Sequence, residues 1–197
     1  MMSLESFGNH LPSIAFIAKM RSGKDEAYSI LEELGYPVYR IAYGDCMKEM
    51  AHLEHPEVPR EPKPIQFYQE YGQQKRAVDK DIFVNATMSK LWFEQELDKT
   101  NDRKRTYVIT DVRQPNEYAA IKKAGFKIVK IHASEEVRIA RMIANGETVT
   151  RDILEAPTEC YLDSYDFDYI LTNNQTREEF KKQIVELIYK LIQEEEN

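Results

Sequence analysis

The stretch Ser13–Leu34, SIAFIAKMRSGKDEAYSILEEL, decides the fold of this 197-residue chain. Residues 13–18 form a short apolar run of the kind that makes a buried strand. Residues 19–25 are dense in positive charge and contain a glycine. The apolar side chains then recur with the i, i+3, i+4, i+7 spacing of one helical face, at Ala27, Ile30, Leu31 and Leu34. The stretch therefore predicts a strand, a basic glycine loop and a helix.

This layout is that of a phosphate-binding P-loop. The backbone N–H groups of such a loop point at phosphate oxygens, the helix N-terminus adds its dipole, and a lysine, here Lys24, supplies a point charge. The pattern G-x-x-x-x-G-K-[S/T] falls on residues 18–25, with Ala18 in place of the first glycine and Asp25 in place of the hydroxyl residue. A carboxylate at position 25 can hold the water shell of Mg²⁺. An ordinary strand–turn–helix with a surface lysine is the alternative.

Net charge, apolar stretches and cysteine spacing argue against several classes of protein. The formal net charge of −7 argues against binding a nucleic-acid polymer. No apolar stretch approaches the ~20 residues of a membrane span, so we expect no membrane partner. Cys46 and Cys160 lack metal or redox spacing, and we interpret both as reduced packing residues of a cytoplasmic protein. His52 and His55 lack partner ligands and are interpreted as surface residues.

Five apolar segments alternate with helical patterns along the chain. The expected strands are residues 13–18, 38–42, 106–110, 127–131 and 169–171. This alternation predicts an α/β fold with right-handed crossovers and one parallel sheet, in a single domain that covers residues 1–197. Ligands of such sheets bind beyond the carboxyl ends of the strands.

Charged side chains follow several of these strand ends. Asp111 comes directly after an apolar strand, where a P-loop enzyme places the acid that organises Mg²⁺, although a simple helix cap would look the same. Arg138 and Arg141 share one helical face, and Arg151 follows in a polar segment. Phosphoryl transfer needs mobile guanidinium groups in and before a lid, whereas each arginine taken singly is more often a solvated surface charge.

One string carries a specific family resemblance. Residues 109–117, ITDVRQPNE, resemble the D-x-R-x-x-x-E segment of phage-type deoxynucleoside monophosphate kinases. Residues 19–25 are similar to the R-S-G-K-D loop of that family, and residues 43–48 to its F-A-D-P-L-K stretch. Gln69-x-x-Gly72, Phe83 at a position that is often Trp, Thr158-Glu159 and residues 167–174 extend the likeness over nearly the whole chain.

The resemblance implies a fold and a reaction. The fold would be that of a P-loop NTPase, a five-stranded parallel sheet flanked by helices. It would also have helices that bind the nucleoside monophosphate (NMP) and a lid. The acceptor-binding insertion would cover about 45–98 and the lid about 145–163. The reaction would be the ATP-dependent phosphorylation of a deoxynucleoside monophosphate, with Mg²⁺, in the cytoplasm (of the host cell, if the protein is phage-derived). Its partners would be small-molecule nucleotides, and the oligomeric state stays open, with a homodimer as one option.

The resemblance also implies roles for individual residues. The ATP phosphates would be bound by Lys19, Arg21, Ser22, Gly23, Lys24 and Asp25. The acceptor nucleotide would be bound by Asp45, Lys48, Gln69, Gly72, Arg76, Phe83, Asp111, Arg113 and Glu117. Together with the strand-end charges described above, this gives Lys24, Asp111, Arg138 and Arg141 as the expected catalytic residues, and Asp25 and Asp111 as the residues that would hold Mg²⁺ through water. Ala18, Glu26 and Cys46 depart from the family pattern, which bears on affinity and metal geometry more than on reaction class.

Two other interpretations fit parts of the sequence. Animal-type phosphomevalonate kinases share the S-G-K-D loop and a stretch similar to Thr158–Asp163. The string at 109–117 favours the nucleotide kinase, and so does the segment 66–83, which is rich in the amides and aromatic rings that a nucleobase needs. A nucleotide-binding regulatory module without turnover is the third interpretation, motivated by Ala18 and the missing loop hydroxyl.

Overall fold

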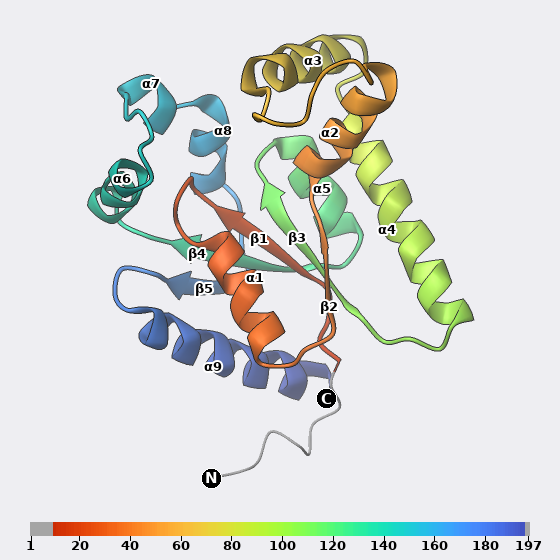
Figure 1. The fold of residues 1–197 in the computed structure, drawn as a ribbon. Helices are drawn as coiled ribbons and strands as arrows, with labels where there is room; N and C mark the ends of the chain where they lie inside the picture. Colours follow the sequence, from red (N-terminus) through yellow and green to blue (C-terminus); the bar gives the residue numbers. More distant parts are fainter. Residues whose placement is uncertain (1–9, 196–197) are drawn as a thin grey trace.

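The structure is a computed structural model, and it describes residues 10–195. Its centre is one sheet of five parallel strands in the order β2-β3-β1-β4-β5 (Figure 1). The strands are β1 (Ile14–Ala18), β2 (Val38–Ile41), β3 (Thr106–Val112), β4 (Lys127–His132) and β5 (Tyr169–Thr172). The predicted α/β fold with a five-stranded parallel sheet is therefore confirmed.

Strand β1 lies in the middle of the sheet, and all five of its residues are buried. It pairs with β3 through Ala15 and Ile109, and with β4 through Phe16 and Val129. Successive side chains of a strand point to opposite faces, so β1 contributes to two separate cores. A residue run that is apolar throughout is what such a strand requires.

Helices cover both faces of the sheet (Figure 1). On one face, α1 (Lys24–Glu33) and α9 (Arg177–Glu195) pack against the strands, with Ile30, Phe180 and Leu191 in a shared core. On the other face, α4 (Ile82–Thr100) and α5 (Pro115–Lys123) pack through Leu91 and Ile121. In a three-layer arrangement of this kind, ligands bind at the carboxyl ends of the strands.

A second, smaller core lies beside the sheet. It joins α2 (Tyr43–Glu54), α3 (Ile65–Val78) and α4 through Ala51, Tyr68, Tyr71 and Phe83. The prediction that His52 is a surface residue is wrong, because its ring is buried at this interface and its Nε2 lies 2.7 Å from the hydroxyl of Tyr68. An aromatic partner on the neighbouring helix, which sequence spacing did not reveal, explains the burial.

The polar segment after α6 (Glu135–Ala144) contains short helices. They are α7 (Arg151–Leu154), α8 (Pro157–Cys160) and the 3₁₀ helix η2 (Tyr161–Asp163). Leu154 and Leu162 are buried, so this segment packs against the domain despite its polar composition. Cys160 is exposed, contrary to its interpretation as a packing residue, whereas Cys46 is buried as expected.

The start of the described chain is also tied to the sheet. Leu11 is fully buried, and its N–H donates to the hydroxyl of Thr106, which in turn donates to the Leu11 carbonyl, both at 2.9 Å. Within residues 10–195, no helix is long and apolar enough to cross a membrane.

Candidate active site

The loop between β1 and α1 has the backbone that a phosphate-binding loop needs. Gly23 has φ 104° and Arg21 has φ 62°, so the chain turns twice through the left-handed region before α1 begins. The Asn173 side chain follows β5, and its Nδ2 donates to the Ser22 carbonyl at 2.9 Å. A Cβ at position 23 would lie 2.1 Å from that Nδ2, so only glycine fits there. The predicted P-loop is thus clamped by a residue from the far end of the sheet.

A cavity of about 700 Å³ opens over this loop. Lys24 and Asp25 line it, and the Lys24 ammonium donates to both carboxylate oxygens of Asp25, at 2.9 and 2.8 Å. Asp25 is otherwise exposed to solvent. The other lining residues are mostly polar or charged and include Met20, Arg21, Gly23, Glu26, Lys63, Arg113, Arg141, Asn145, Glu147, Asn173, Gln175, Arg177 and Phe180. Its size suits a nucleotide-sized ligand, and it carries the cations that phosphates require.

The two predicted lid arginines lie in different environments. Arg141 lines the cavity, where it donates to the Arg21 carbonyl at 3.0 Å and to the Asn173 carbonyl at 2.9 Å. Burial lowers the pKa of its guanidinium from the usual value. Arg138 is buried outside that cavity, with its Nη1 4.0 Å from Glu159 Oε2. Arg151 is mostly exposed and pairs with Glu155 at 3.2 Å.

Asp111 connects β3 to the start of α2. Its two carboxylate oxygens accept from the N–H groups of Tyr43 and Gly44, at 2.9 and 2.8 Å. Burial raises the pKa of Asp111, while these two N–H groups act in the opposite direction. Asp111 therefore caps a helix from another part of the chain, at the N-terminal end where a negative charge is favoured.

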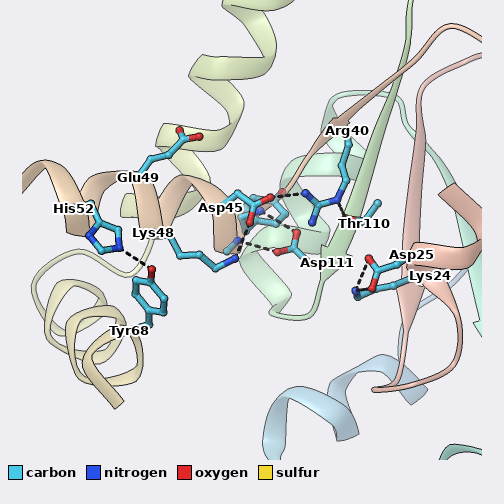
Figure 2. Close-up of polar contacts among 12 residues, drawn as sticks. Lys24, Asp25, Arg40, Asp45, Lys48, Glu49, His52, Tyr68, Thr110 and Asp111 are labelled. Carbon is cyan, nitrogen blue, oxygen red and sulfur yellow. Dashed lines mark hydrogen bonds and ion pairs between the residues drawn. The ribbon is translucent and has the colours of Figure 1, made fainter. Parts of the chain in front are cut away.

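Arg40 is not among the predicted site residues, but it lies beside Asp45 and Asp111 (Figure 2). Its guanidinium pairs with Asp45 and donates from Nε to the Thr110 hydroxyl at 3.1 Å. Lys48 donates to the other Asp45 oxygen at 2.7 Å. Burial opposes ionisation of Asp45, but the hydrogen bonds from Lys48 and Arg40 outweigh it and lower the pKa of this carboxyl. A charged residue inside the short strand 38–41 was the signal that could have revealed Arg40.

The segment after β3 places Arg113 and Glu117 differently. Arg113 lines the large cavity and donates from Nη1 to Glu159 at 2.8 Å. Glu117 is buried, and its Oε2 accepts from the N–H groups of Arg113 and Gln114, at 2.8 and 3.0 Å. Burial, opposed by these N–H groups, raises the pKa of Glu117 to about 7. Glu117 thus holds the turn that carries Arg113.

The predicted acceptor residues of α3 and α4 form a group of their own. Gln69, Gly72 and Arg76 have the i, i+3, i+7 spacing of one helical face. The Arg76 guanidinium lies 4.8 Å from the centre of the Phe83 ring, which is buried in the small core. Arg76 also acts electrostatically on Glu117. The α3 face therefore lies near the end of β3, and Gln69 is exposed on it.

The fold family implies Mg²⁺, and the site offers carboxylate oxygens of the kind that this ion binds. Among residues 10–195, no group of three or more acidic, histidine or cysteine side chains is placed to hold a metal ion. Mg²⁺ usually keeps several waters and takes one or two carboxylates together with substrate phosphates. Asp25 and Asp111 are oxygen donors of this kind, and both act electrostatically on Arg40. The residues therefore fit an ion held largely through water and phosphate.

The remaining loop residues are held by acids of the segment that follows α6. Lys19 pairs with Asp163 at 2.6 Å, and Arg21 Nε donates to Glu147 at 3.1 Å. Ser22 is buried, and its hydroxyl has no hydrogen-bond partner in the described part of the chain. Lys19 and Ser22 face a smaller cavity of about 190 Å³ together with Arg138. The structure thus separates Lys19, Ser22 and Arg138 from the cavity that contains Lys24 and Arg141.

Sheet order, loop and cavity together define a P-loop phosphotransferase fold, and solved structures show the same fold. The chain is similar to TT1252 from Thermus thermophilus (TM-score 0.59, 16% identity, covering 92% of this chain and 98% of that one). It is also similar to the dephospho-CoA kinase of Campylobacter jejuni (TM-score 0.53, 16% identity, covering 93% of this chain and 98% of that one). A gluconokinase of Sinorhizobium meliloti 1021 is similar too (TM-score 0.54, 15% identity, covering 93% of this chain and 94% of that one). No curated protein sequence matches the chain.

The family model for deoxynucleotide monophosphate kinase matches residues 75–184. This match covers more than half of the chain, including Asp111, Arg113 and residues 145–163. The chain belongs to the deoxynucleotide monophosphate kinase family, as its sequence resemblance predicted. It is a nucleoside monophosphate kinase, an enzyme that uses ATP and acts on small-molecule nucleotides.

Proposed function

We propose that this enzyme transfers the γ-phosphoryl group of ATP to the phosphate of a deoxynucleoside monophosphate in the large cavity. One observation carries the site assignment: Lys24 of the P-loop and Arg113 of the family segment line the same cavity, although they lie far apart in the sequence. Donor phosphates at Lys24 and an acceptor phosphate at Arg113 would then share one space. Phosphoryl transfer depends mainly on such positioning and on charge stabilisation.

Each side chain has a role that follows from its place. Lys24 would exchange its contact with Asp25 for the β- and γ-phosphates, since an ammonium is a mobile point charge. Arg141, held by two carbonyl oxygens at the cavity wall, would neutralise charge on the transferring group. Asp25 and Asp111 would hold Mg²⁺ through water, and the bound ion would supply charge neutralisation for the phosphates.

The acceptor would be bound by the helices of the insertion. We propose that residues 45–98 form the acceptor-binding unit, in which Lys48 and Arg76 contact the monophosphate and Gln69 contacts the base. Gly72 would leave room for the guanidinium of Arg76, because a Cβ there would lie 3.0 Å from Arg76 Nη1. Asp45 would hold Lys48 and Arg40 in place. Residues 145–163 would act as the lid, and the enzyme would work in the cytoplasm.

The experiment is an ADP-release assay with purified wild type and Lys24→Ala. The acceptors are the four common deoxynucleoside monophosphates, modified ones, the ribonucleotides and phosphomevalonate. We expect turnover with at least one deoxynucleotide and little with phosphomevalonate, whose carboxylate needs extra cations where α3 supplies amides. Greater turnover of phosphomevalonate than of every nucleotide would overturn the proposal. ATP binding without any ADP release would favour the regulatory module instead.

A further inference from the structure

A single buried carboxylate joins the P-loop to the acceptor segment. Glu159 belongs to α8, and its side chain is 1% exposed. Its Oε2 accepts from the N–H group of Met20 at 2.7 Å, and its Oε1 accepts from Arg113 Nη1 at 2.8 Å. Hydrogen bonds to an ionised acceptor are among the stronger ones in proteins. One side chain of the lid segment therefore fixes two elements that are separate in the sequence.

Glu159 lies behind the site and not in it. Met20 and Arg113 both line the large cavity, whereas Glu159 does not. A ligand in the cavity would contact the two partners and not the carboxylate that holds them. Any effect of Glu159 on the reaction must therefore pass through the P-loop and Arg113.

The P-loop needs support at this point. Arg21, the residue after Met20, has φ 62°, a conformation that residues with a Cβ rarely adopt. Such a conformation persists only where the surrounding structure holds it. Glu159 fixes the N–H of Met20 on one side, and Arg141 binds the Arg21 carbonyl on the other. The two contacts bracket the strained residue.

Arg138 is a third partner of Glu159, through the opposite charges of the two side chains. Arg138 is buried, its Nη1 lies 4.0 Å from Glu159 Oε2, and within residues 10–195 its Nε and Nη1 have no hydrogen-bond partner. Glu135 also lies close, with its Oε2 3.9 Å from Arg138 Nη2. Neutralising Glu159 would leave Arg138 with less compensation in a buried place, which is costly. A carboxylate is therefore required at position 159, and an amide of the same shape is not equivalent.

We propose that Glu159 is a positioning residue that holds the P-loop at Met20–Arg21 and the guanidinium of Arg113 in one geometry for phosphoryl transfer. This inference rests on the proposed function, since it assumes that Met20 and Arg113 border the donor and acceptor phosphates. A displacement of about 1 Å of a positioning group can reduce a rate by about 10²-fold. Glu159 thereby extends the site into the lid segment.

The test compares Glu159→Gln with Glu155→Gln, a control in the same segment whose carboxylate is mostly exposed and bonds Arg151. For Glu159→Gln we expect kcat/KM to fall about 10²-fold, with higher KM for both ATP and the acceptor. A purely structural role would reduce the active fraction, so that kcat would fall while both KM values stayed unchanged. That second pattern, or kinetics equal to those of the control, would overturn the proposal.

Two further measurements keep the test decisive. Glu159→Asp retains the charge but is one methylene shorter, so it cannot reach both partners. If Glu159→Gln does not fold, the Asp variant is the test, and wild-type kinetics there would refute the proposal. Combining Glu159→Gln with Arg113→Ala should raise the acceptor KM little beyond Arg113→Ala alone, whereas full additivity would exclude action through Arg113.

Failure of the proposed function has a different signature. In that case the wild type would phosphorylate none of the deoxynucleotides. Calorimetric binding of a non-hydrolysable ATP analogue still tests Glu159 in that event, because the Met20 contact does not depend on the acceptor. Weaker binding by Glu159→Gln than by Glu155→Gln would support the positioning role, and equal binding would refute it.

Discussion

The side-chain amide of Asn173 lies against Gly23 so closely that a Cβ at position 23 would be 2.1 Å from its nitrogen. Asn173 follows β5 at one edge of the sheet, and Gly23 ends the loop after the central strand β1. The amide nitrogen donates to the carbonyl of Ser22. The shape of the phosphate-binding loop is thus set partly by a residue from the last strand of the chain.

Gly23→Ala should abolish ATP binding and leave the domain folded. The added methyl group clashes with Asn173, and φ 104° is strained for alanine. The matched control is Gly35→Ala, because Gly35 has φ 82° and no atom within 4 Å of the added Cβ. We expect the control to lose about 1 kcal/mol of stability and to keep its ATP affinity. Calorimetric titration with an ATP analogue checks both variants, and equal affinities would contradict the clamp.

Lys24→Ala should fold normally and lose phosphoryl transfer. The lysine contacts the exposed carboxylate of Asp25 and contributes nothing to the apolar cores. Removing one such electrostatic stabiliser costs about 10²–10³ in rate, or about 3–4 kcal/mol. Turnover close to that of the wild type would refute the P-loop assignment, and a collapse of the melting temperature would show a structural role instead.

Arg138 and Arg141 should differ when each is changed to alanine. Arg141→Ala should lower kcat more than it raises the acceptor KM, because a group at the cavity wall acts on charge that develops during transfer. Arg138→Ala should lower stability, since it removes a buried side chain and the more distant partner of Glu159, although Glu159 keeps Arg113 at 2.8 Å. Steady-state kinetics and thermal unfolding of both variants separate the two effects. Equal kinetic losses at equal stability would restore the original expectation that both arginines contact the phosphoryl group.

Gln69→Ala should weaken the preferred deoxynucleotide by about 1–3 kcal/mol through an unpaired base edge. Gln74→Ala is the control, because Gln74 is exposed on α3 away from the face that carries Gln69, Gly72 and Arg76. The measurement is kcat/KM for each nucleotide. Similar values for the two variants would place the base elsewhere.

Glu117 should make the folded state less stable as pH rises. Burial raises its pKa from 4.5 to about 7, so the folded protein binds this proton more tightly than the unfolded chain. The stability that the protonated form gives is fully present below pH 4.5 and is lost as pH rises to about 7. Glu117→Gln should remove this component, which amounts to about 3 kcal/mol. The free energy of unfolding, measured with denaturant between pH 4.5 and about 7, checks this prediction. The same pH dependence for wild type and Glu117→Gln would contradict it.

Local sequence pattern was sufficient to predict the sheet and the loop. The run 13–18 is apolar because β1 is covered on both faces, and the spacing of Ala27, Ile30 and Leu31 follows the buried face of α1. The same rule placed Asp111 at a strand end. These features depend on near neighbours in the chain, which is why periodicity and turn residues reveal them.

Contacts between distant segments were beyond the same reasoning. Arg40 and Glu159 are each held by partners on other elements. His52 is buried because it contacts Tyr68 of the neighbouring helix. Sequence spacing places Arg138 and Arg141 on one face of a helix. Only the way α6 packs in the fold shows that Arg138 is buried while Arg141 borders the cavity. A charge in the middle of a short strand was the one local sign that Arg40 has polar partners on neighbouring elements.

The carboxylate that Met20 and Arg113 share also links two binding equilibria. If ATP at the P-loop strengthens or weakens the hold of Glu159 on Arg113, it changes the affinity for the acceptor by some factor. Thermodynamic reciprocity then requires that the acceptor change the affinity for ATP by the same factor. The two nucleotides would then influence each other through the protein as well as through direct contact, and Glu159→Gln would remove the part of this coupling that passes through the carboxylate.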